Sequence, residues 1–312
     1  MWHVKILLTM FVAVATVSLL GACAGTPRNT AVQDNVSHIR EAAEQGDAQA
    51  QYKLGGMYEN GQGVSQNYQE AAKWWRKAAE QGLVKAQFNL GFMYANGHGV
   101  PQNYEEALKW YHQAAERGDA HAQFNLGYMY EKGQGVSRDY QEAIKWYRQA
   151  ADQDIARAQL NLGNMYRLGQ GDAPNSQEAL KWYHQAAAHG YAQAEYNLGV
   201  MYDEGQGVPQ NYQEAVKWYR LAAAQGYALA QFNLGTMYGM GRGVPQNDVE
   251  GYAWIIVAAE NGDEEANHAK AVLQQRMSFS QIATAAEQRA KEIQAELGRK
   301  KNANLLLPNK QP

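Results

Sequence analysis

The sequence predicts an all-α protein, a right-handed α-solenoid in which helix-turn-helix repeats stack into a superhelix. Three features repeat every 36 residues: a Leu-Gly pair, a Gly-x-Gly linker, and a second helical segment opened by Asn or Asp. A fixed period of this length is typical of units that bury their apolar faces only against their neighbours. The Leu-Gly pairs are Leu54-Gly55, Leu90-Gly91, Leu126-Gly127, Leu162-Gly163, Leu198-Gly199 and Leu234-Gly235.

The first 22 residues have the pattern of an export signal. Lys5 precedes a 15-residue apolar run that is too short for a comfortable membrane span. The run ends in Leu20-Gly21-Ala22-Cys23, which resembles the bacterial lipobox and contains the only cysteine. We therefore expect a lipoprotein signal peptide over 1–22 and a lipidated Cys23, which attaches the protein to the outer membrane if the host is Gram-negative. The alternative is an ordinary secretory signal in which Cys23 is incidental.

Residues 24–33 are polar without a helical period, so we expect the lipidated cysteine and a flexible tether over 23–38. The repeat array is predicted over 39–268, as a half unit followed by six full units. In a typical unit, Ala86, Leu90 and Met93 fall on one face of the first helix, and the second helix starts at Tyr104. The array then ends in a helical cap over 269–297 and a disordered tail over 298–312.

Each second helix is predicted to open with a capping box, in which Asn or Asp is followed three residues later by Glu. Both side chains would then satisfy backbone donors, which makes this glutamate column structural rather than catalytic. A tryptophan column from Trp74 to Trp254 lies beside alanines at helical spacing and is expected in the core. The capping pairs are Asn67/Glu70, Asn103/Glu106, Asp139/Glu142, Asn175/Glu178, Asn211/Glu214 and Asn247/Glu250.

Residues 86–100 and 104–118 (AQFNLGFMYANGHGV and YEEALKWYHQAAERG) resemble the Sel1-like repeat, a longer-linker relative of the tetratricopeptide repeat. The resemblance implies an adaptor or scaffold, in bacteria often an exported one. Our leading expectation is a lipid-anchored scaffold that mediates protein–protein interaction in the bacterial envelope. The alternatives are a secreted or surface virulence factor that binds a host protein and a cell-wall or β-lactam-acting enzyme.

Several function classes find no support in the residues. The formal charge of −3 is no footprint for nucleic acid, and the Gly-x-Gly linkers follow no strand that would make a nucleotide loop. The histidines lack metal-binding spacing, so we expect neither metal nor cofactor. The absence of Ser-x-x-Lys and Lys-Thr-Gly argues against an enzyme of the β-lactam class.

A candidate binding surface lies on the first helix of each repeat, on the face turned away from the Leu-Gly pair. In tetratricopeptide proteins the equivalent face lines a concave groove, and amide side chains can pair with the backbone of an extended peptide. The alternative is that the asparagines join neighbouring repeats. The candidate residues are a regular column of Asn89, Asn125, Asn161, Asn197 and Asn233 and a variable column that includes Phe92, Tyr128 and Asn164.

Overall fold

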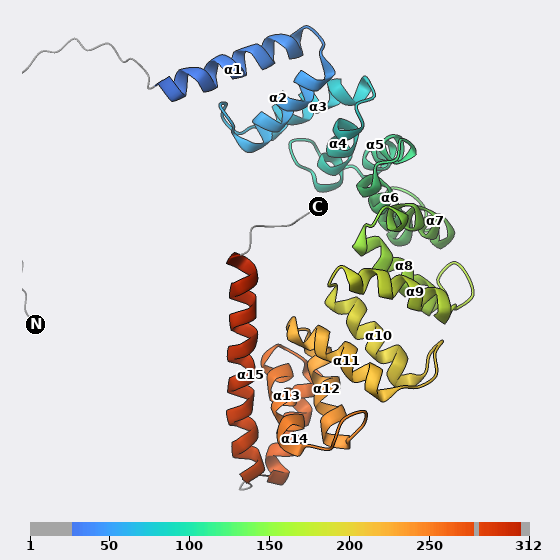
Figure 1. Ribbon diagram of the computed structural model, residues 1–312. Coiled ribbons are helices and arrows are strands. Elements are labelled where there is room, and N and C mark those ends of the chain that lie inside the picture. Colours follow the sequence, from blue (N-terminus) through green and yellow to red (C-terminus); the bar gives the residue numbers. More distant parts are fainter. Residues whose placement is uncertain (1–26, 278–280, 307–312) are drawn as a thin grey trace, which may run out of the picture.

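The computed structural model describes residues 27–277 and 281–306, and every regular element in these ranges is an α-helix. The chain is an α-solenoid that follows a curved path (Figure 1). The first helices of the six repeats are here called the A helices. They are α2 (Ala48–Asn60), α4 (Val84–Asn96), α6 (Ala120–Lys132), α8 (Ala156–Leu168), α10 (Ala192–Glu204) and α12 (Ala228–Met240).

The second helices, here called the B helices, pack behind the A helices. They are α3 (Tyr68–Glu80), α5 (Tyr104–Glu116), α7 (Tyr140–Asp152), α9 (Ser176–Ala188), α11 (Tyr212–Ala224) and α13 (Asp248–Glu260). The array is preceded by α1 (Pro27–Glu44) and followed by α14 (Glu264–Met277) and α15 (Gln281–Leu306). In Figure 1, α4, α6 and α8 lie nearer the inside of the curve than the helix that follows each, while α13 and α15 lie on the inside toward the C-terminus. The core between the two layers contains alanine and leucine without solvent exposure, and Trp74, Trp110, Trp146 and Trp182 are buried as the sequence predicts.

Helix ends follow the predicted signals with one correction. The Asn67 side chain accepts hydrogen bonds from the backbone of Gln69 and Glu70, as a capping residue should. The second predicted bond of the capping box, from the backbone N–H of Asn67 to the Glu70 side chain, is wrong. The Asn67 N–H donates instead to the carbonyl of Tyr58. The Glu70 carboxylate is therefore available to pair with Lys73. Asp154 adopts φ 62°, in the left-handed position that glycine takes in the other repeats.

Two predicted boundaries differ from the structure. Helix α1 begins at Pro27, so the tether expected over 23–38 is helical from that residue onward, and its Val36 is buried. Proline suits a first helical turn, where its missing N–H is not needed. Helix α15 continues to Leu306, so the tail expected over 298–312 is helical as far as that residue. The apolar pattern of α15 ends at Leu297 and residues 298–300 are exposed, but the backbone remains helical. The predicted signal peptide and Cys23 lie outside the described residues.

The last helix covers the final B helix of the array. Tyr252, Ile256 and Val257 of α13 form one buried cluster with Ala286 and other apolar residues of α15. An ion pair between Arg289 and Glu250 (2.9 Å) adds to this contact. In the sequence, an outer position that is Lys in the earlier B helices becomes Ala253 in α13, and one that is Arg or His becomes Ile256. These substitutions let α15 bury a face that is solvent-exposed in the other repeats.

Candidate functional site: the inner face of the A helices

The inner face is the side of each A helix that does not pack on a B helix. In α6 it carries Asn125, Tyr128 and Glu131, one helical turn apart. Tyr128 and the equivalent Phe92 of α4 are 40% and 41% exposed, which is high for large apolar rings. The asparagines are half-buried at the base of the same stripe. The structure thus places both predicted columns on the same side of the A helices.

Tyrosines from the B helices reach this surface through gaps left by glycine. A Cβ atom at Gly127 would lie 2.5 Å from the ring of Tyr147, so only glycine lets the ring pass. The Tyr147 hydroxyl donates a hydrogen bond to Oε2 of Glu131 (2.7 Å). Burial and the nearby carboxylate raise the pKa of Tyr147 well above its usual range. The same arrangement recurs at Gly91/Tyr111, Gly163/Tyr183 and Gly199/Tyr219, while Trp75 occupies the gap at Gly55.

Four of the five asparagines are tied to these tyrosines. Asn125 of α6 hydrogen-bonds the hydroxyl of Tyr111 in α5, which joins the A helix to the B helix before it. This hydrogen bond lowers the pKa of Tyr111, but burial raises it by more. The equivalent pairs are Asn161 with Tyr147, Asn197 with Tyr183, and Asn233 with Tyr219. Asn89 differs, because the repeat before it has Trp75 in place of the tyrosine, and the Trp75 indole donates to the Tyr52 carbonyl.

The variable column divides into two kinds of residue. Phe92 and Tyr128 project into solvent. Asn164 instead joins the amide network, because it accepts hydrogen bonds from the Tyr183 hydroxyl (2.7 Å) and from Nδ2 of Asn197 in the next repeat (3.2 Å). The two columns therefore meet at the fourth and fifth repeats, where adjacent A helices share a hydrogen bond.

Sequence reasoning missed a third column on this surface. Glu131, Arg167 and Asp203 occupy the same position in successive repeats, and each contacts the hydroxyl of its own repeat's tyrosine. The distances from the hydroxyls to Arg167 Nε and to Asp203 Oδ2 are both 3.3 Å. The alternation of charge at a 36-residue spacing was present in the sequence. Its link to the tyrosines required the fold.

The described residues contain neither a cluster of metal-ligating side chains nor a membrane-spanning helix. No group of three or more His, Cys, Asp or Glu side chains is placed to hold a metal ion in this part of the chain. Among the helices over 27–277 and 281–306, none combines the length and apolarity required to cross a bilayer.

Comparison with known proteins decides the family. The Sel1 repeat model matches six consecutive segments, residues 48–83, 84–119, 120–155, 156–191, 192–227 and 228–263. The chain belongs to the Sel1 repeat family. Sel1 repeat proteins generally mediate protein–protein interaction and are generally non-enzymatic scaffolds. No curated protein matches the sequence.

Two solved structures are similar to this Sel1 array. One is a protective antigen present in uropathogenic Escherichia coli strains, which displays an SLR fold. It is 36% identical with a TM-score of 0.74, over 83% of this chain and 56% of the antigen, so the array spans little more than half of that protein. The other is a Sel1 repeat protein from Oxalobacter formigenes, 34% identical with a TM-score of 0.62, over 74% of this chain and 92% of that one.

Proposed function

We propose that this Sel1 array is an exported, lipid-anchored scaffold of the bacterial envelope that binds an extended segment of a partner protein along its inner face. The observation that carries the proposal is the row of half-buried asparagine amides beside exposed Phe92 and Tyr128. A primary amide has two donor hydrogens and an acceptor oxygen. A single bond to a tyrosine leaves capacity for the backbone of a bound peptide, and exposed rings add apolar contact.

The envelope location rests on Leu20-Gly21-Ala22-Cys23 in the sequence. Acyl chains on Cys23 would hold the protein at a membrane by hydrophobic burial, and stable anchoring needs more than one chain. The array would then present its inner face to proteins of the same compartment. A second candidate function is a surface or secreted factor that binds a host protein, which the similarity to an Escherichia coli protective antigen favours. We propose no catalysed reaction and no cofactor for this chain.

The partner can be found by crosslinking from the proposed surface. A photo-reactive amino acid at Tyr128 should crosslink a partner in membranes of the native host, because this ring is exposed on the inner face. The matched control is the same amino acid at Lys145, which lies on the B helix α7. A protein captured equally from both positions does not bind by the inner face.

Asparagine substitutions then separate binding from joining of repeats. Asn125→Ala with Asn161→Ala removes two amides that also bond Tyr111 and Tyr147, so affinity and thermal stability should both fall. At about 0.5–1.5 kcal/mol for each hydrogen bond, the affinity loss is roughly 5- to 150-fold. Asn89→Ala is the discriminating variant, because the preceding repeat has Trp75 at the position from which a B-helix tyrosine bonds each of the other four asparagines. It should weaken binding without lowering the melting temperature. Unchanged affinity in both variants means that the column only joins repeats.

A further inference from the structure

A ladder of buried glutamines joins successive repeats. In five A helices a buried glutamine donates its Nε2 hydrogen to a backbone carbonyl near the end of the preceding helix. In α4, for example, Gln87 donates to the carbonyl of Ala79 at 3.1 Å. The other members are Gln51 to Ala43 (3.0 Å), Gln123 to Ala115 (3.2 Å), Gln159 to Ala151 (3.2 Å) and Gln231 to Ala223 (3.1 Å).

The fifth repeat has a glutamate at this position. Glu195 is 5% exposed, and its Oε2 accepts a hydrogen bond from Nε2 of Gln225 (2.8 Å). Gln51 receives the equivalent bond from Gln81 on its amide oxygen. By the repeat register, the second carboxylate oxygen of Glu195 replaces the amide N–H that the other repeats direct at the carbonyl equivalent to that of Ala187. An ionised carboxylate and a carbonyl are both acceptors, so this joint lacks one donor.

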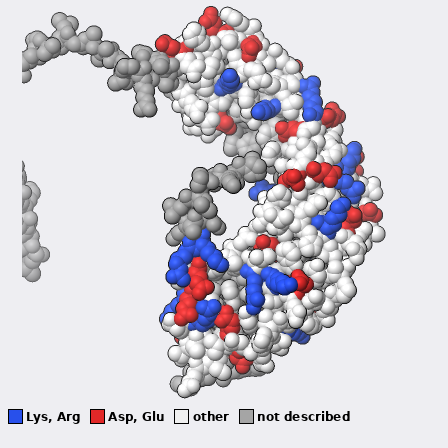
Figure 2. Space-filling model, viewed as in Figure 1, with Lys and Arg blue, Asp and Glu red and all other residues white. Residues whose placement is uncertain are grey.

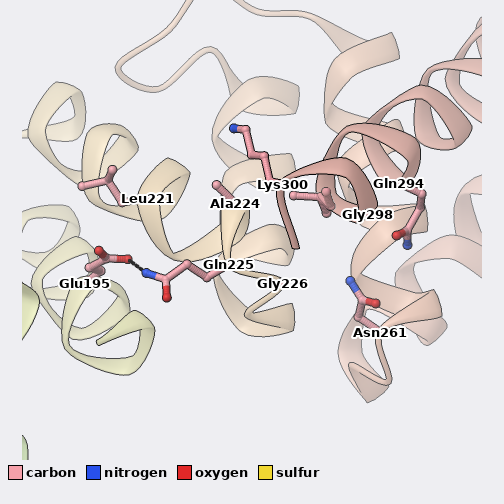
Figure 3. A pocket seen from close by; sticks show the side chains of 10 residues that line it. Glu195, Leu221, Ala224, Gln225, Gly226, Asn261, Gln294, Gly298 and Lys300 are labelled. Carbon is pink, nitrogen blue, oxygen red and sulfur yellow. Dashed lines mark hydrogen bonds between the residues drawn. The ribbon is translucent and has the colours of Figure 1, made fainter. Parts of the chain in front are cut away.

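A cavity of ≈ 800 Å³ opens beside the glutamate, between the end of α11 and the C-terminal half of α15 (Figure 3). Its wall includes Leu221 and Ala224 of α11 and Leu297 of α15. Leu221 is 49% exposed at a position where the four earlier repeats have Lys or Gln. Two departures from the repeat pattern, an acid and an apolar side chain, thus meet in one cavity.

The basic residue in the cavity wall, Lys300, does not neutralise Glu195. Lys300 lines the same cavity from α15 (Figure 3). Among the described residues no ion pair joins the two side chains. Gln225, Asn261 and Gln294 supply uncharged amides to the wall. Burial without a positive partner raises the pKa of Glu195.

We propose that this cavity binds an alkylammonium group, supplied by a lysine side chain or by a free amine. The N–H groups of the ligand donate to the Glu195 carboxylate and supply the positive charge that this buried acid lacks. The carbon chain of the ligand lies against Leu221 and Leu297. This site is separate from the inner face, so the proposal stands or falls independently of the proposed function.

The test titrates n-butylammonium into the full chain at pH 8 and follows binding by NMR and by the melting temperature. The wild-type chain should bind saturably and gain thermal stability. Glu195→Gln should bind at least tenfold more weakly, and it should fold well because it restores the residue of five other repeats. A charged control, n-butyltrimethylammonium, has no N–H donor and should also bind at least tenfold more weakly.

A second arm distinguishes the two sources of the ligand. The peptide Gly-Gly-Lys-Gly-Gly should bind if the cavity admits a lysine side chain. The same peptide with norleucine in place of lysine is the control. If the lysine peptide does not bind but n-butylammonium does, the ligand is a free amine. Equal binding of n-butylammonium to the wild type and to Glu195→Gln overturns the proposal. Failure of the folded wild-type chain to bind n-butylammonium also overturns the proposal, because a proton on Glu195 then supplies the missing donor.

Discussion

Two neighbouring glycines in α2 allow a direct test of how the repeats pack. A Cβ atom at Gly55 would lie 2.5 Å from Nε1 and 3.0 Å from Cγ of Trp75. A Cβ atom at Gly56 would meet nothing within 4 Å. Both residues lie within the same helix, so Gly55→Ala and Gly56→Ala differ in tertiary contact and hardly at all in helix propensity.

The magnitude follows from three contributions. Replacing glycine by alanine inside a helix stabilises it by about 1 kcal/mol, and this gain is common to both variants. Overpacking a buried contact costs about 1–3 kcal/mol. Displacing the Trp75 ring also breaks its hydrogen bond to the Tyr52 carbonyl (3.0 Å), which costs a further ~0.5–1.5 kcal/mol. Gly55→Ala should therefore be less stable than Gly56→Ala by about 1.5–4.5 kcal/mol.

Urea unfolding followed by circular dichroism measures the difference, together with the near-ultraviolet signal of tryptophan. Gly56→Ala should be as stable as the wild type or more stable. Gly55→Ala should unfold at lower urea and change the tryptophan signal. Equal stability of the two variants would refute the reasoning, because it would mean that the Leu-Gly glycine is not needed for helix–helix contact.

Three other outcomes are expected. Burial raises the pKa of Glu195 above its usual 4.5, so the protonated side chain stabilises the fold fully below pH 4.5, and this stabilisation is lost as the pH rises through the pKa of the folded state. The melting temperature of Glu195→Gln should therefore exceed that of the wild type by a margin that grows with pH. Removal of 281–312 should expose the apolar face of α13 and cause aggregation, which light scattering measures. Ala253→Lys with Ile256→Arg should restore solubility to the truncated chain. A truncated chain that stays monomeric without these substitutions would show that α15 is dispensable. Cys23→Ser should move the protein from the membrane fraction to the soluble fraction or block its processing, and a fully processed wild-type protein that is wholly soluble would contradict lipid anchoring.

The candidate site could be predicted from the sequence only as far as its columns. The spacing of Asn125 and Tyr128 on one helix placed them on a common face, and the structure agrees. The hydrogen bond from Asn125 to Tyr111 was not predictable, because it links helices of different repeats and depends on a tyrosine ring that passes a glycine. For the same reason, the choice between binding a ligand and joining repeats needs Asn89, whose neighbour lacks that tyrosine.

The sequence by itself determined the repeat, its helix ends and the buried columns, because these depend on local hydrogen bonds and on a helical period that recurs every 36 residues. Only the tertiary structure decided which partners meet across repeats. The backbone N–H of Asn67 bonds Tyr58 instead of Glu70, and α15 packs mainly on α13. These outcomes turn on competition between partners distant in sequence, and side-chain spacing within one helix carries no information about them.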